Sequence, residues 1–244
     1  MAFAKCAGPV SSVAPAGQLR AVVAGDSTGI VTLFDAETGV ERQRFQCESA
    51  VMSVAYAPDL RAVISGDGSM CKGASQVVIW DVDTGCRRYE MNYKNMVCAI
   101  CYSKELRSIV TGDGNFSEKN RSGQVVCWSV DNGEKHLKVP CEGPVMAVAH
   151  APELHAIISA DRSNKVILWD TQAKCQRLDI ACEDLPCCVA YLPEMGAIAI
   201  GESHFNEHRG RLLLADASTG QTRLELPSEG PLMSVANVEG LGAV

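Results

Sequence analysis

A fixed interval of 33 residues between a large side chain and an acidic residue constrains this chain more than any other feature. The interval occurs four times in the 244 residues: Phe34 to Asp67, Trp80 to Asp113, Trp128 to Asp161 and Trp169 to Glu202. The reverse interval, from an acidic residue to the next large side chain, varies between 8 and 15 residues. A constant interval alternating with a variable one indicates a repeat array with one elastic loop in each unit.

Each repeat unit contains four short segments with the character of β-strands. In the second unit the first segment, residues 51–56, alternates large and small side chains, and the second, 62–65, runs into the acidic residue. The third segment, 77–80, is the most apolar, and the fourth, 87–90, is charged, as suits an exposed sheet edge. Units of 41 to 48 residues match four-stranded propeller blades. The sequence therefore predicts an all-β fold, a β-propeller of four-stranded antiparallel blades.

The repeat interval also predicts where the blades begin and end. We expect a single domain over 1–244 with blades at about 8–47, 48–91, 92–141, 142–182 and 183–226, and a partial one made of 227–244 with 1–7. Adding 33 to Ala215 passes the last residue, Val244, so the sixth blade is split or incomplete. Residues 1–6 are expected to form its fourth strand and 232–244 its first strands. If these ends do not meet, the chain is a segment of a larger propeller.

The large side chain of each unit is followed by a second recurring residue. The pairs are Trp80-Asp81 and Trp169-Asp170, with degenerate forms at Phe34-Asp35, Trp128-Ser129 and Ala215-Asp216. On these pairs the chain resembles the WD-repeat family of β-propellers over essentially its whole length. The resemblance implies a protein-interaction platform rather than an enzyme. The family's Gly-His is absent, so its His–Ser/Thr–Asp–Trp network cannot be complete here; Ser65, Thr111 and Ser159 remain at the hydroxyl position.

The acidic residues that end the second strands are expected on one rim of the fold. They are Asp26, Asp67, Asp113, Asp161 and Glu202. Acidic side chains at strand ends commonly accept backbone N–H bonds of the following turn, and we favour this structural role. The functional alternative is an acidic rim that attracts a basic peptide or a cation.

The three longest loops, 68–76, 114–124 and 203–211, fall on the same predicted rim. They carry hydrophobic and cationic side chains of the kinds enriched at interface centres. These are Met70, Lys72, Phe116, Lys119, Arg121, Phe205 and Arg209. The first hypothesis is therefore a non-catalytic scaffold that binds a protein or peptide on this rim, within a multi-protein assembly.

Neither the cysteines nor the histidines predict a metal site. Cys6, Cys47, Cys141 and Cys182 occupy equivalent positions in different units, too far apart for thiolates that must lie about 2.3 Å from one ion. In a strand the members of the pairs Cys98/Cys101 and Cys187/Cys188 point to opposite faces. His204 and His208 match a zinc-peptidase spacing that needs a helix, but they fall in a loop between strands. We expect no metal, no cofactor and no catalytic residue.

Two alternative functions remain open. The first is a ligand- or metal-binding propeller enzyme that uses an axial pocket, the acidic rim and the histidine loop. The second is RNA or anion binding through residues 92–141, which hold seven bases and five acids, including Lys119 and Arg121. The pI near 5.3 argues against general nucleic-acid binding. With no apolar run of membrane-spanning length and no export signal, we expect no membrane partner, reduced thiols and a cytoplasmic location, with the nucleus as the alternative.

Overall fold

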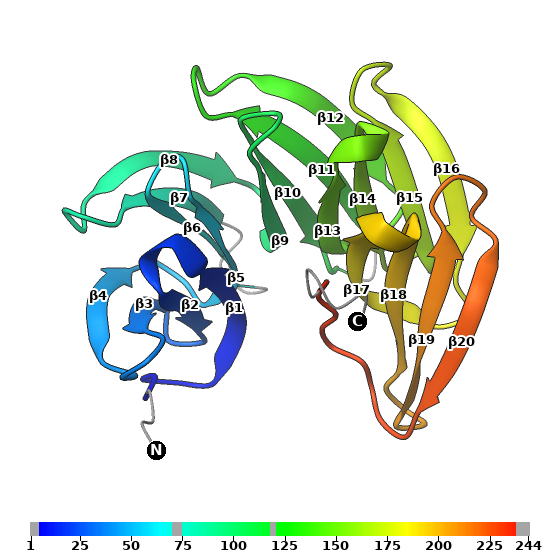
Figure 1. The fold of residues 1–244 in the computed structure, drawn as a ribbon, viewed down its shortest axis with the longest axis horizontal. Helices are drawn as coiled ribbons and strands as arrows, with labels where there is room; N and C mark the ends of the chain where they lie inside the picture. The colour runs from blue at the N-terminus through cyan, green and yellow to red at the C-terminus, as the bar shows by residue number, and fades with distance from the viewer. Residues whose placement is uncertain (1–4, 70–74, 118–120, 238–244) are drawn as a thin grey trace. The chain divides into compact units, whose positions relative to one another are not determined.

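The computed structural model describes residues 5–69, 75–117 and 121–237, and over these residues the chain is all-β. Twenty strands form five antiparallel four-stranded sheets, each built from four strands consecutive in the sequence (Figure 1). The chain divides into two compact units, Met1–Asp113 and Gly114–Val244, and the division falls within β10. The prediction of antiparallel four-stranded units is confirmed.

The first sheet contains β1 (Val10–Ala16), β2 (Ala21–Asp26), β3 (Ile30–Asp35) and β4 (Glu41–Gln46). The second contains β5 (Val51–Ala57), β6 (Ala62–Asp67), β7 (Ser75–Asp81) and β8 (Arg87–Tyr93). The third contains β9 (Met96–Ser103), β10 (Ser108–Asn115), β11 (Ser122–Ser129) and β12 (Lys135–Cys141). The fourth contains β13 (Val145–Ala151), β14 (Ala156–Asp161), β15 (Lys165–Asp170) and β16 (Cys175–Ala181). The fifth contains β17 (Leu185–Leu192), β18 (Ala197–His204), β19 (Arg209–Asp216) and β20 (Thr222–Ser228).

The only helical elements among the described residues are three single-turn 3₁₀ segments between first and second strands. These are η1 (Gly17–Leu19), η2 (Pro152–Leu154) and η3 (Pro193–Met195). Proline at the start of η2 and η3 presets the backbone angle of the turn. None of the three has the length or the hydropathy of a membrane-spanning helix.

The large side chain that opens the 33-residue interval coincides with a β-bulge. The register between the third and fourth strands shifts at this position in the first four sheets, at Phe34, Trp80, Trp128 and Trp169. A bulge increases local twist and redirects the strand. The fixed interval therefore begins where the sheet is bent and ends at the last residue of the next second strand or two residues before it.

The hydrophobic core lies between consecutive sheets inside each unit. In the first unit Phe45 of β4 packs against Trp80 of β7, with ring centroids 5.3 Å apart, and both belong to a buried cluster that joins the first and second sheets. In the second unit a second cluster joins the fourth sheet to the fifth, with Leu168 and Ile200 fully buried. Apolar residues on both faces of the inner strands account for this stacking.

Buried hydroxyl groups accept hydrogen bonds from the indole N–H groups of two tryptophans. Trp80 Nε1 donates to Ser65 Oγ and Trp169 Nε1 donates to Ser159 Oγ, both at 2.8 Å. Ser65 Oγ also lies 3.4 Å from the thiol of Cys47, at the end of the preceding sheet's outer strand. Cys47 therefore packs against the next sheet, which gives this member of the repeated cysteine position a structural role.

The strands predicted at the two chain ends are absent from their described residues, and the predicted end of the second strands is wrong in two sheets. Lys5, Cys6 and residues 231–237 carry no strand; residues 1–4 and 238–244 lie outside the described residues. The backbone N–H groups of Ala7 and Gly8 point to Asp26 instead of a sheet partner. At the other end the Leu232 carbonyl accepts from Ser203 Oγ at 3.0 Å, and no described strand pairs with this segment. The second strands β10 and β18 each continue two residues beyond the acidic position instead of ending there.

Close contact between sheets makes Gly66 a sensitive position. A Cβ atom there would lie 2.7 Å from the Ile100 Cδ1 and Val97 Cγ1 atoms of the next sheet. We expect Gly66→Ala to lower the free energy of unfolding by about 1–3 kcal/mol, because overpacking forces the sheets apart. Gly17→Ala is the matched control, since nothing lies within 4 Å of its Cβ position. Urea unfolding followed by circular dichroism checks both; equal effects would contradict the packing argument.

Candidate functional site

Asp26 shows what the acidic residue does at the end of a second strand. It is buried, and its carboxylate accepts from Thr28 Oγ1 at 2.6 Å, from Thr28 N at 2.9 Å and from Ile30 N at 3.2 Å. It also accepts from Ala7 N and Gly8 N, which enter the first strand, at 3.2 Å. Burial acts to raise the pKa of Asp26, but the hydrogen bonds from Thr28, Ile30 and Gly8 outweigh it and lower the pKa below 3.8.

The equivalent residues Asp67, Asp113 and Asp161 are also buried and hydrogen-bonded locally. Asp67 accepts from Gln76 N at 2.6 Å and from Ser49 N at 3.1 Å. Asp161 accepts from Ser163 N at 2.8 Å and from its hydroxyl, and Asp113 accepts from Asn95 Nδ2 at 3.2 Å. Burial raises the pKa of Asp67 and of Asp161 above the ordinary value. The expected structural role of these acids is confirmed for Asp26, Asp67 and Asp161.

Glu202 differs because its partner is a side chain. Its carboxylate is fully buried, and Oε2 accepts from Arg211 Nε at 2.5 Å. The guanidinium of Arg211 also lies 2.8 Å from Glu183. The neighbouring Cys182 thiol has a raised pKa, first because it is buried and then because of the Glu202 charge, so it stays protonated. A role of these five acids in attracting a cation stays a prediction, and their carboxylates are not presented to solvent.

The loop residues proposed to contact a partner are placed unevenly. Met70, Lys72 and Lys119 lie outside the described residues. Arg121 is exposed at the start of the β11 strand. Phe116 is half-buried, and the Arg162 guanidinium lies 5.7 Å from its ring centroid. This is a cation–π contact between the loops that follow β10 and β14.

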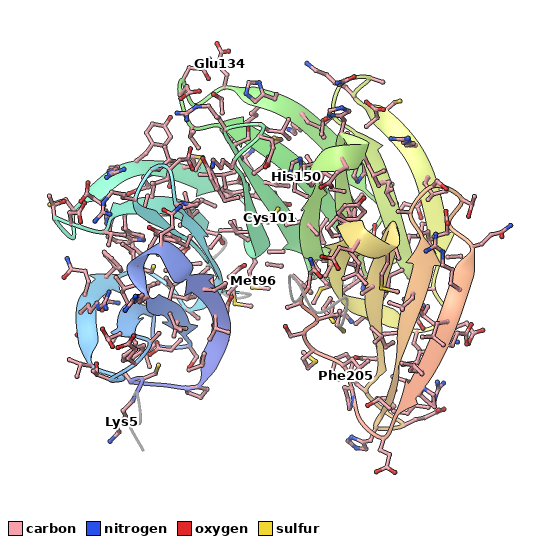
Figure 2. All side chains as sticks on the ribbon, viewed as in Figure 1. Lys5, Met96, Cys101, Glu134, His150 and Phe205 are labelled. Carbon is pink, nitrogen blue, oxygen red and sulfur yellow. The ribbon has the colours of Figure 1, made fainter. Side chains whose placement is uncertain are left out.

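The predicted loop 203–211 is a tight turn. The β18 strand runs to His204 and β19 begins at Arg209, which leaves only residues 205–208 between them. Figure 2 shows Phe205 at this turn, and its side chain is 46% exposed. Arg209 is anchored by Asp184 at 2.8 Å and by Glu207 at 2.6 Å. The hairpin holds Phe205 in place on a strand-supported tip.

The same turn removes the geometry required for a zinc-peptidase site. His204 ends a strand and its Nδ1 accepts from Glu207 N at 3.1 Å, while His208 has a left-handed backbone with φ of 52°. The two histidines therefore do not share a helical face. Within residues 5–69, 75–117 and 121–237, no group of three or more His, Cys, Asp or Glu side chains could hold a metal ion.

Arg162 is the contact residue that sequence reasoning missed. It follows the buried Asp161 in one of the short loops, whereas the prediction considered only long loops. Besides Phe116, its charge acts on the Cys187 thiol at the start of the fifth sheet: burial raises the pKa of Cys187, and Ser203 and Arg162 partly offset the rise. Arg162 thus contacts the loop after β10 through Phe116 and acts electrostatically on the start of the fifth sheet.

The two kinds of buried aspartate are expected to respond to acid with opposite signs. Asp26→Asn should lower the free energy of unfolding at pH 7 by about 1–3 kcal/mol, since the turn loses a charged acceptor. Because the pKa of Asp26 is lowered, its contribution is lost as the pH falls below 3.8, so wild type and variant should converge there. The raised pKa of Asp161 means that its ionised form opposes folding. As the pH falls, the free energy of unfolding of the wild type should therefore rise relative to that of Asp161→Asn.

Urea unfolding between pH 7 and about pH 3 measures both differences. Two results at low pH would support the lowered pKa of Asp26 and the raised pKa of Asp161. The free energy of unfolding of the wild type should approach that of Asp26→Asn, and it should rise relative to that of Asp161→Asn. The same trend for both variants would contradict them.

No protein-family model matches the chain, and no curated protein matches it. Among solved structures, the fold is similar to a crystal structure of the computationally designed protein Ika8, with a TM-score of 0.72 and 15% sequence identity. The match covers 94% of this chain and 65% of Ika8, so the chain spans less than two thirds of the length of the designed protein. At this identity the likeness concerns the fold alone.

Proposed function

We propose that the five sheets are blades of a WD-repeat-type β-propeller, or of part of one, and that the chain is a non-catalytic scaffold for a protein or peptide partner. The supporting observations are repetition and rigidity. Five four-stranded antiparallel sheets follow one another, and consecutive sheets pack face to face within each unit. A buried acid holds the turn after the second strand in the first, second and fourth sheets. Turns held in this way present their side chains at a small entropic cost.

The observation that carries the binding proposal is the aromatic and arginine contact between Phe116 and Arg162. The two side chains come from loops of consecutive sheets, so they form a composite surface rather than a feature of one loop. Phe205 adds a second aromatic side chain at the turn of the next sheet. Aromatic residues, including Phe, and Arg are enriched at the centres of protein interfaces, where buried aromatic and Arg side chains commonly act as anchors.

Removing these two aromatic side chains should weaken capture of the partner without unfolding the protein. We expect Phe116→Ser with Phe205→Ser to reduce partner recovery by about 10- to 100-fold, equivalent to one or two interface hot spots. Val40→Ser is the matched control, because Val40 is 62% exposed on the turn between β3 and β4 and is not part of the proposed surface. Affinity capture with quantitative mass spectrometry compares the three proteins; a retained set unchanged by the double variant would contradict the proposal.

A metal-dependent enzyme is the competing function, and it is tested separately. We expect purified protein to contain less than one zinc ion per chain, because the Nδ1 atom of His204 is occupied by the Glu207 N–H and the turn separates the two histidines. Inductively coupled plasma mass spectrometry measures the content. One zinc per chain that is lost in both His204→Ala and His208→Ala would favour the enzyme instead.

A further inference from the structure

The outer strand of the third sheet carries positive charges on its exposed side. In β12, Leu137, Val139 and Cys141 are buried, while Lys135, His136 and Lys138 are exposed. We call these three residues the β12 strip, whose positive charge comes from Lys135 and Lys138. The strand follows the turn that contains Glu134, labelled in Figure 2, and it is the terminal strand of its sheet (Figure 1). Exposed charges on an edge strand are common, so the comparison with the other four sheets decides whether the strip is unusual.

Each other sheet neutralises the residue equivalent to Lys138, ten positions after the large side chain. The equivalent residues are one arginine and three acids, and each has an oppositely charged partner in its own sheet. The pairs are Arg44–Glu41 at 2.5 Å, Glu90–Arg87 at 3.2 Å, Asp179–Lys165 at 3.9 Å and Glu225–Arg211 at 3.5 Å. In the third sheet Lys135 stands where the first sheet has Glu41, so Lys138 faces a like charge instead of a partner.

The residue equivalent to His136 is also neutralised in other sheets. It is an arginine in all four, and three of these arginines bind the aspartate that follows the large side chain. The pairs are Arg42–Asp35, Arg88–Asp81 and Arg223–Asp216. In the third sheet this aspartate is replaced by Ser129. The third sheet has therefore exchanged both of its carboxylate positions for neutral or positive side chains.

The neighbouring groups do not restore the missing negative charge. Lys135 Nζ lies over the Trp128 ring, 4.6 Å from the centroid, and this contact orders the lysine without neutralising it. Glu134, the adjacent acid, accepts from Asn132 Nδ2 at 3.0 Å within its own turn. Across the described part of the chain, no ion pair joins a carboxylate to the β12 strip. This positive strip stands out in a chain whose formal net charge is −7.

We propose that the β12 strip docks an acidic, extended segment of a partner protein, with acidic side chains at alternate positions. His136 and Lys138 are two residues apart in a strand, so they project to the same side about 7 Å apart. An extended peptide with acids two residues apart has the same spacing. Beside β12, its acidic side chains would come within about 5 Å of Lys138, as charge partner, and of the His136 ring, as hydrogen-bond donor. Pro140 has no N–H to donate, so backbone pairing is confined to Lys135–Val139.

Charge also determines which segments are excluded. Lysines on an edge strand discourage pairing with other strands. A neutral strand would bury their charges without a partner, and a second copy of β12 would repel them. An acidic segment reverses that balance. The strip is short, and the Trp128 ring beneath Lys135 is not available as a platform for stacked bases, so a protein segment suits it better than RNA. This surface is independent of the Phe116, Arg162 and Phe205 surface, and either proposal can fail alone.

The test uses the full chain and a fluorescein-labelled peptide of alternating glutamate and threonine, with fluorescence anisotropy as the readout. We expect saturable binding that weakens as NaCl is raised from about 0.05 M to about 0.5 M. Lys135→Glu should reduce affinity about 10-fold or more, because it restores the internal pair seen between Glu41 and Arg44. Arg44→Glu on β4 makes the same change in net charge at another edge and should leave binding unchanged.

Three results would overturn the proposal: absence of saturable peptide binding, equal losses in Lys135→Glu and Arg44→Glu, or strip-dependent binding of a poly(U) oligonucleotide that exceeds peptide binding. Lys138→Gln provides a second variant that removes one charge without reversing it, and it should give a smaller loss than Lys135→Glu. Circular dichroism and thermal unfolding identify any variant that does not fold. A loss of affinity counts only in variants whose spectra match that of the wild type.

Discussion

Burial of a carboxylate at the end of each second strand is the constraint on which the repeated structure depends. In the first and second sheets a glycine precedes the acid, and the next sheet approaches so closely that a Cβ atom on this glycine would collide with it. The acid then binds the backbone of the following turn and of the segment that leads into its own first strand. One carboxylate thus holds both the turn and the segment that enters the sheet. The backbone N–H groups there are shielded from water, and the buried carboxylate supplies the hydrogen-bond acceptor that they would otherwise lack.

The third sheet is the unit in which the local charge pattern departs from the repeat. Its strands keep the repeat's apolar core, with Val125, Val126 and Val139 buried, but its outer strand lacks the carboxylates that neutralise the other outer strands. Because the core and the outer edge use alternate residues of the same strand, the edge can change its charge without disturbing the packing. This separation is the physical reason why an outer strand can acquire a binding preference while the sheet is preserved.

The candidate loop surface depends on a contact that local patterns do not specify. The sequence predicted the loop residues Phe116, Phe205 and Arg209, and the structure describes all three. It did not predict Arg162, because Arg162 lies in a short loop and reaches a residue 46 positions earlier in the chain. Similarly, Glu202 matched the acidic repeat, but its pairing with Arg211 required the actual length of β18 and β19. Side-chain contacts between loops depend on the loop conformation, and that conformation follows from the strands rather than from composition.

The C-terminal segment also shows that a local sequence pattern does not determine strand pairing. Residues 232–236, Leu-Met-Ser-Val-Ala, resemble the start of β5, yet they form no strand. A strand needs backbone hydrogen bonds to a neighbouring strand, and no described strand pairs with them, although Leu232 accepts from Ser203 Oγ of β18. By itself the sequence determined the repeat interval, the four-stranded antiparallel unit and the structural role of the buried acids, since these depend on residues close in the chain. Only the tertiary structure decided which strands pair at the ends, which loops meet and which outer edge keeps its charge, because each of these outcomes depends on groups brought together from distant positions.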